Sequence, residues 1–134
     1  MGRAAISTAA RRPAHIAERG ATVTEVRELI DAFNAAWNAH DLPAALALCT
    51  PDVVFESTDP APDGGRFEGL DAVRDVWRPV FDAGGRFAFE EVTVLGDRVV
   101  QRWRFDWGTG HVRGIDLITV RDGRVAVKLS YVKG

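Results

Sequence analysis

The sequence predicts an α+β fold in which a cone-shaped, curved antiparallel sheet wraps around a long N-terminal helix. The last third of the chain alternates apolar and polar residues in three strand-like runs, 98–107, 111–121 and 124–132. Glycine-containing turns at 108–110 and 122–123 separate these runs, and such turns close tight hairpins. The helical patterns all come earlier in the chain, and this segregation of helices from strands is typical of α+β folds.

Two helices are expected before the first strand. Thr22 and Glu25 form a capping box that begins a long helix, which an apolar stripe continues to about His40. Asp41 can cap a second, short helix with Pro43 in its first turn, where proline is tolerated. The stripe of the long helix consists of Val23, Val26, Ile30, Phe33 and Trp37. The segment 50–52 contains a proline and is expected to break the short helix.

The middle of the chain predicts a strand, a loop, a third helix and a further strand. A strand at 53–57 precedes a loop at 58–65 that is rich in proline, glycine and aspartate, and Phe67 lies in a short extended piece. The third helix runs from about Leu70 to Phe81, although Pro79 makes its last turn uncertain. Its apolar side consists of Val73, Val76, Trp77 and Val80. A strand at 86–95 then turns into the final three strands, and a sheet this twisted would curl into a cone with one open mouth.

Size and charge restrict the class of protein. The 134 residues suit one domain at 22–134, preceded by an Ala- and Arg-rich arm at 1–21 that we expect to be flexible. A net charge of −2 argues against a nucleic-acid partner, and no apolar run reaches the ~18 residues of a membrane span. The single cysteine, Cys49, fits a reducing cytoplasm and a place in the core. No metal-ligand spacing or phosphate loop is present, so neither a metal nor a cofactor is expected.

The inner face of the predicted sheet indicates a ligand pocket. Asp116, Lys128 and Ser130 share this face with bulky aromatic residues and do not belong in a plain core. Aromatic walls with a few polar groups are typical of a site for a small hydrophobic molecule. The side chains expected to contact the ligand are Phe33, Trp37, Phe55, Ser57, Trp77, Trp103, Phe105, Trp107 and Ser130.

The order of elements and two segments, 33–42 and 112–125, resemble the nuclear transport factor 2-like superfamily, and most closely its SnoaL-like branch. The resemblance extends from about Val23 to Val132 and implies the cone-shaped fold. It does not imply one reaction, because this superfamily includes isomerases, epoxide hydrolases, cyclases, dehydratases and non-catalytic modules.

Ketosteroid isomerase, a member of this superfamily, uses a carboxylate base and an oxyanion hole made of a tyrosine and a protonated aspartic acid. The resemblance places the oxyanion aspartate at Asp116 and the base at either Ser57 or Asp59. The tyrosine position is Phe33, which cannot donate a hydrogen bond. Lys128 on the next strand would favour the ionised form of Asp116, so this type of enolisation is not expected.

Two other catalytic sets are also incomplete. Limonene epoxide hydrolase has an Arg-x-Asp element that Arg104 and Asp106 resemble, but alternation directs both side chains outward. Its second aspartate position is Ser130. The His-x-Asp pair of SnoaL-like cyclases falls on Lys128 and Ser130, and the chain's three histidines are expected in solvated positions.

Two functions from different classes therefore stay open. The first is a cofactor-independent acid/base enzyme of isomerase, cyclase, lyase or hydrolase type, in which Asp116, Lys128 and Asp59 carry the reaction. Lys128 would be a base or a Schiff-base nucleophile. The second is a non-catalytic binding or dimerisation module, in which Asp116 and Lys128 only join two strands and Asp59 is an ordinary turn residue.

The outer face of the last strand predicts self-association. Val127, Leu129 and Tyr131 alternate with the inward polar residues and would form an exposed apolar patch on a monomer. Members of the superfamily commonly pair through this face of the sheet. We therefore expect a homodimer.

Overall fold

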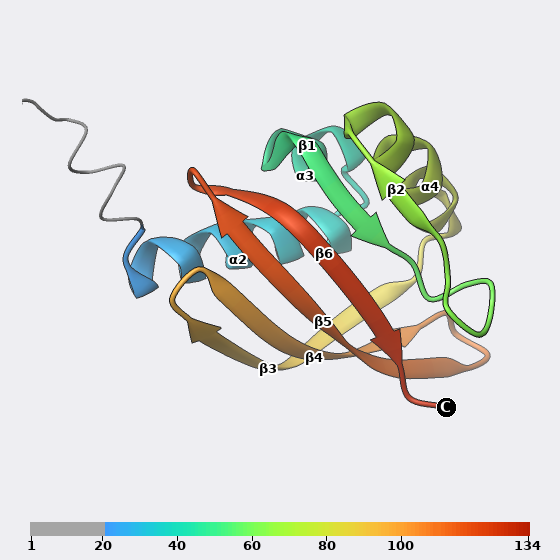
Figure 1. Cartoon of the computed structure of the whole chain (residues 1–134). Coiled ribbons are helices and arrows are strands. Elements are labelled where there is room, and N and C mark those ends of the chain that lie inside the picture. The colour runs from blue at the N-terminus through green and yellow to red at the C-terminus, as the bar shows by residue number, and fades with distance from the viewer. Residues whose placement is uncertain (1–20) are drawn as a thin grey trace, which may run out of the picture.

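The structure, a computed structural model, describes residues 21–134, so the expected arm lies outside the described residues except for Ala21. Six strands form one sheet in the order β2-β1-β6-β5-β4-β3, in which β1 and β6 are parallel and all other neighbours are antiparallel. The elements are α2 (Val23–Asn38), α3 (Leu42–Ala47), β1 (Cys49–Glu56), β2 (Arg66–Glu68), α4 (Leu70–Ala83), β3 (Arg86–Leu95), β4 (Arg98–Asp106), β5 (His111–Arg121) and β6 (Arg124–Val132). The predicted α+β fold with a curved, unclosed sheet is confirmed (Figure 1). No helix in this part of the chain is long and apolar enough to cross a membrane.

The first helix, α2, begins at the predicted capping box. The Thr22 hydroxyl accepts a hydrogen bond from the Glu25 backbone N–H at 3.1 Å, and the Glu25 carboxylate accepts one from the Thr22 N–H at 2.8 Å. The packed stripe begins one turn later than expected, because Val26 is buried whereas Val23 is 56% exposed. From there α2 lies behind the strands in the view of Figure 1 and covers the concave face of the sheet.

The first strand is longer than the sequence predicted. It begins at Cys49 rather than at 53, because Cys49 pairs with Val125 of β6 in the parallel ladder. Pro51 does not end the element, since the register shifts between Cys49 and Val54, and such an irregularity is where a strand tolerates proline.

The third helix, α4, keeps its last turn despite Pro79 and ends within two residues of the expected Phe81. It continues through Pro79 to Ala83 and is closed by Gly84, which has the left-handed φ of +78° that glycine permits. Phe81 in the last turn is buried, whereas Val80, which was expected on the apolar side, is exposed. Val80 instead borders the cavity described below.

Two bulges accompany the curvature of the sheet. Glu90 is inserted between the pairs Phe89–Trp103 and Glu91–Arg102, and Ala126 is inserted in β6 opposite the step from Thr119 to Val120. A bulge bends its strand and increases the local twist. The long strands therefore curve around α2, as Figure 1 shows, and the three helices lie on one side of the sheet. No helix of residues 21–134 covers its convex face.

Aromatic rings fill the closed end of the cone. The Trp37 ring lies 4.4 Å from Phe81 and 4.9 Å from Trp77, measured between ring centroids. Phe33 packs behind both tryptophans, at 6.2 Å from Trp37 and 5.9 Å from Trp77. These rings from α2 and α4 fix the inner limit of the space that remains open.

Candidate functional site

A cavity of about 600 Å³ lies between the concave face of the sheet and helices α2 and α4. This is a typical size for a site that encloses a small molecule. Most of its lining is aromatic or aliphatic, and the exposed Trp107 and the segment after β1 border it. The lining consists of Trp37, Phe55, Ser57, Thr58, Asp59, Val76, Trp77, Val80, Phe87, Trp103, Phe105, Trp107, Val112, Lys128, Ser130 and Val132.

Most residues predicted to meet a ligand do line this cavity, but two do not. Phe33 is fully buried in the core behind Trp37 and Trp77, because its place on α2 faces the closed end of the cone. Asp116 is 2% exposed and lies beneath the lining rather than in it.

The prediction missed Phe87, although the alternation of β3 directs it inward opposite Phe105. Counting alternation along that strand would have found it.

Among the described residues that line the cavity, Lys128 is the one with a positively charged side chain. Its ammonium Nζ donates a hydrogen bond to the Ser130 hydroxyl at 3.0 Å and lies 3.5 Å from Oδ1 of Asp116. It also lies 4.9 Å from the ring centroid of Trp37 and 4.9 Å from that of Phe55, within reach of a cation–π contact with each. A side chain only 9% exposed is thus held by one hydroxyl, one carboxylate and two aromatic faces.

Asp116 is the centre of a buried hydrogen-bond network. Its Oδ1 accepts from the Trp103 indole N–H at 3.0 Å and from the Ser130 hydroxyl at 2.8 Å, and its Oδ2 accepts from the Gln101 amide at 3.0 Å. Gln101 in turn exchanges two hydrogen bonds with Asn34 of α2. Gln101 and Ser130 are the cross-strand partners of Asp116, so strand register alone brings these groups together.

This network encloses the carboxylate that the sequence predicted to meet a ligand. Both carboxylate oxygens already accept hydrogen bonds, and neither borders the cavity. The Asp116 carboxylate therefore contacts Lys128 and Ser130, which line the cavity, without lining the cavity itself. The Ser130 hydroxyl connects the two, since it accepts from Lys128 and donates to Asp116.

The two candidates for the base position after β1 lie at the mouth of the cavity. The Ser57 hydroxyl donates to the Asp59 carbonyl oxygen at 2.6 Å and accepts from the Gly65 N–H at 3.0 Å. Ser57 thus fixes the loop that follows it. Asp59 is exposed on that loop and is the acidic side chain of the lining.

The single cysteine is unsuited to nucleophilic chemistry. Cys49 is 1% exposed, and burial raises the pKa of its thiol to about 12, an effect that the charge of Lys128 only partly opposes. The reactive form of a cysteine is the thiolate. Within residues 21–134, no cluster of three His, Cys, Asp or Glu side chains is arranged to hold a metal ion.

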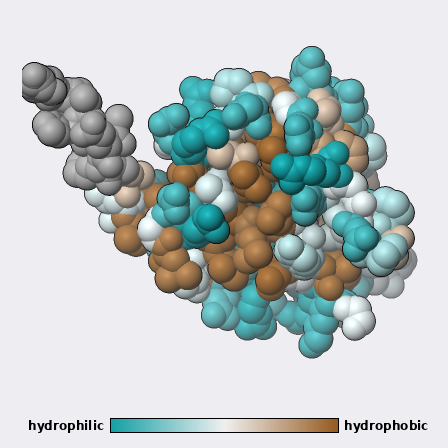
Figure 2. All heavy atoms as spheres, in the orientation of Figure 1, coloured by the Kyte–Doolittle hydropathy of each residue, from teal (hydrophilic) through white to brown (hydrophobic). Residues whose placement is uncertain are grey.

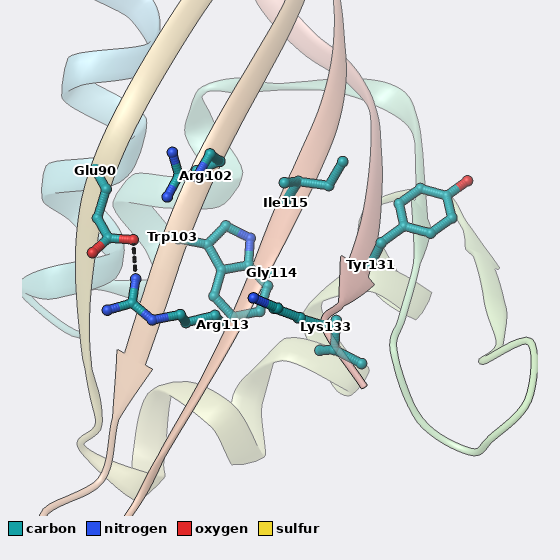
Figure 3. A pocket seen from close by; sticks show the side chains of 9 residues that line it. Glu90, Arg102, Trp103, Arg113, Gly114, Ile115, Tyr131 and Lys133 are labelled. Atoms are coloured by element: carbon teal, nitrogen blue, oxygen red, sulfur yellow. Dashed lines mark hydrogen bonds and ion pairs between the residues drawn. The ribbon is translucent and has the colours of Figure 1, made fainter.

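The convex face carries a second hollow, of about 420 Å³ (Figure 3). It lies over Gly114, where a missing side chain lets the Trp103 ring approach, so that Trp103 borders both hollows. Arg113 is paired with Glu90 on this face, and Arg102 with Glu91. The lining consists of Glu90, Arg102, Trp103, Arg113, Gly114, Ile115, Tyr131, Val132 and Lys133.

A helix laid in a strongly curved antiparallel sheet, with an aromatic cavity between helices and sheet, defines a nuclear transport factor 2-like protein. The SnoaL-like domain family matches residues 30–128, and the chain belongs to that family. No curated protein sequence matches the chain at a significant level.

Solved structures agree with this assignment. A nuclear transport factor 2-like protein of unknown function from Mesorhizobium loti is 38% identical, with a TM-score of 0.75 over 83% of this chain and 93% of that one. A Sinorhizobium meliloti protein provisionally named a polyketide cyclase is 24% identical, with a TM-score of 0.67 over 77% and 93%. A Kribbella flavida protein provisionally named a ketosteroid isomerase is 14% identical, with a TM-score of 0.72 over 83% and 79%. The last two likenesses establish the fold alone.

Proposed function

We propose that this chain binds a small hydrophobic molecule in the concave cavity and converts it by cofactor-independent acid/base chemistry of isomerase, cyclase, lyase or hydrolase type. The observation that carries the proposal is the Lys128 ammonium in the lining of an aromatic cavity, beside a buried carboxylate. Ionisable pairs in clefts are enriched at functional sites. The buried Cys49 suits a reducing cytoplasm as the place of action.

The lining supplies one group that can act as an acid and one that can act as a base. Lys128 can donate a hydrogen bond or a proton to a substrate oxygen that gains negative charge, and such preorganised donors are a major source of catalysis. The Asp59 carboxylate at the mouth can take a proton from carbon and return it to a neighbouring carbon. That sequence moves a proton within the substrate and needs no oxidant, reductant or metal.

The names of two structural relatives support an enzymatic function, since polyketide cyclase and ketosteroid isomerase are both names of enzymes. Neither catalytic set is carried over, because this chain has Lys128 and Ser130 where the cyclases are expected to have histidine and aspartate. Lys128 therefore carries the acid role in this proposal.

A screen of small aromatic and alicyclic compounds by thermal unfolding tests the proposal. At least one compound is expected to raise the melting temperature, and its conversion should be lost in Lys128→Met with folding retained. Lys133→Met is the matched control, because these two are the only lysines in the sequence and Lys133 lies at the convex hollow. Equal turnover by Lys128→Met, or no stabilising compound at all, would contradict the proposal.

The alternative is a binding module without chemistry, and the saturated hydrogen bonding of Asp116 favours it. In that case Asp116, Ser130 and Lys128 join β5 to β6 and orient a ligand that is released unchanged. A compound that binds with Lys128-dependent affinity but is recovered unaltered after long incubation would select this alternative.

We also propose that two copies pair through the convex face of the sheet. Apolar side chains gather at the centre of this face and polar residues surround them (Figure 2). Cross-strand pairing places Ile115 beside Tyr131 and Leu117 beside Leu129, on the side opposite Asp116 and Lys128. Leu117 and Tyr131 are 36% and 50% exposed. A second copy suits this face because its rim carries both signs of charge, in the pairs Arg102–Glu91 and Arg113–Glu90.

A further inference from the structure

We infer that the ligand of the concave cavity is an aromatic or alicyclic ring that bears a carboxylate. The carboxylate lies at the inner end of the cavity, where Lys128 binds it. This inference rests on the proposed function, because it names the class of molecule that the same cavity takes. Its grounds are the distribution of charge, of hydrogen-bond donors and of aromatic surface in the lining.

The first ground is the placement of charge. Lys128 lies among the rings of Trp37 and Phe55 in the interior, whereas Asp59 is exposed on the loop that follows β1. The described lining contains no other charged side chain. An anionic group is therefore favoured at the inner end and disfavoured at the mouth, which fixes the direction in which such a ligand enters.

The second ground is a surplus of donors. An ammonium has three hydrogens, and among residues 21–134 the oxygen partners of Nζ are the Ser130 hydroxyl and the Asp116 carboxylate, besides the aromatic faces of Trp37 and Phe55. The hydroxyls of Ser57 and Ser130 already donate within the protein. In the part of the chain that the structure describes, Trp37 and Trp77 have indole N–H groups without an acceptor, but both are buried below the surface, so the remaining ammonium hydrogen is the donor that a ligand reaches. A carboxylate offers acceptors only, and so complements this set.

Asp116 does not cancel the attraction. Its oxygens accept hydrogen bonds from Trp103, Ser130 and Gln101, and Asp116 does not line the cavity, so an anion there approaches the ammonium rather than this carboxylate. The same carboxylate keeps Nζ in place, so the ammonium meets a ligand without first losing side-chain freedom.

The third ground is the shape of the walls. Phe87 and Phe105 lie 4.5 Å apart and Phe87 and Trp103 lie 5.5 Å apart, measured between ring centroids. Together with Trp37 and Phe55 these rings form aromatic walls on both sides of the ammonium. A flat hydrocarbon body with a carboxylate at one end would stack on these rings while its charge reaches Lys128.

Calorimetric titration with three matched probes tests the inference: 2-naphthoate, the neutral 2-naphthamide and the cationic 2-naphthylmethylammonium. The expected order of affinity is naphthoate, then amide, then ammonium, with at least about a tenfold gap between the first two, as for a hydrogen bond to a charged group. Lys128→Arg should keep the order, and Lys128→Met should reduce the gap to about twofold or less.

The convex hollow contains Arg102, Arg113 and Lys133, so an anion could also bind there (Figure 3). Lys133→Met is the matched control and should leave the affinity of naphthoate unchanged. A loss of naphthoate binding in Lys133→Met but not in Lys128→Met would overturn the inference by placing the anion on the convex face.

The remaining outcomes separate the inference from the function on which it rests. Equal affinities for naphthoate and naphthamide in the unmodified protein would overturn the carboxylate inference and leave the proposed function intact. Absence of binding by all three probes, together with a negative thermal screen, would overturn both. If Lys128→Met does not fold, the ranking in the unmodified protein, repeated in Lys133→Met and Lys128→Arg, still tests the inference.

Discussion

Lys128 and Asp116 face each other from neighbouring strands, with Nζ 3.5 Å from Oδ1, and only the lysine borders the cavity. The two members of the pair therefore have different roles. Asp116 holds the position of Lys128 through its negative charge and through Ser130, and in the proposed function the Lys128 ammonium contacts the ligand.

Asp116→Asn should destabilise the protein by about 3 kcal/mol, because it leaves a buried ammonium without its counter-charge. The quantity to measure is the free energy of unfolding in urea. Asp116→Asn combined with Lys128→Met should recover at least half of the loss, since the unpaired charge is then removed. Asp97→Asn is the control, because Asp97 pairs with Arg98 at 3.9 Å on the exposed surface and should cost less than about 0.5 kcal/mol. A loss in Asp116→Asn as small as in this control would contradict the buried-pair account.

Stability should decline above about pH 9 in a way that depends on Cys49. Burial raises the pKa of this thiol from 9.0 to about 12, so between these values the unfolded chain releases a proton that the folded chain retains. The stabilisation is complete below pH 9 and is lost as the pH rises, by at most about 1.4 kcal/mol per pH unit. Urea unfolding at pH 8, 9 and 10 should show a steeper decline for the natural protein than for Cys49→Ala. Parallel curves would show that Cys49 ionises no differently in the two states.

Gly114→Ala should destabilise the sheet by about 1–3 kcal/mol, as overpacking does. A Cβ at this position would lie 2.2 Å from the Tyr131 carbonyl oxygen and 2.5 Å from Cζ2 of Trp103. Displacement of the Trp103 ring should also weaken its hydrogen bond to Asp116 and change the tryptophan fluorescence. Gly134→Ala is the control, because no atom lies within 4 Å of the Cβ that it would add. An unchanged melting temperature and emission spectrum in Gly114→Ala would contradict the close approach of strand and ring.

Leu117→Lys should convert a dimer to a monomer, because it places a charge at the centre of the convex apolar patch. Light scattering at micromolar concentration should give twice the chain mass of 14.6 kDa for the natural protein and the single mass for the variant. Leu95→Lys is the matched control, since Leu95 is exposed at the end of β3, beside the β3–β4 turn, and outside the patch. A natural protein of single mass would refute the proposed dimer.

Strand alternation and turn chemistry were enough to predict most of the fold. The runs at 111–121 and 124–132 match β5 and β6, and the inward placement of Trp103, Phe105, Lys128 and Ser130 follows from period-two alternation. The capping box likewise predicted where α2 begins. These features depend on neighbouring residues, which a sequence displays directly.

The errors have in common that long-range contacts decide them. Cys49 joins a strand because of a parallel ladder with Val125, a pairing across most of the chain. Asp116 was expected in the cavity, but Gln101, Trp103 and Ser130 enclose its carboxylate beneath the lining. Phe33 faces inward as predicted, yet Trp37 and Trp77 lie between it and the open space. Alternation gives the face on which a residue lies, and tertiary packing decides whether a cavity reaches it.

The most direct test of the central claim is a crystal structure of the protein with 2-naphthoate bound. The account predicts the naphthalene ring between the walls formed by Trp37, Phe55 and Phe87, with a carboxylate oxygen within about 3.5 Å of the Lys128 Nζ, a normal distance for a charged contact. Naphthoate seated in the convex hollow beside Lys133, or a concave cavity that stays empty at saturating naphthoate, would contradict it.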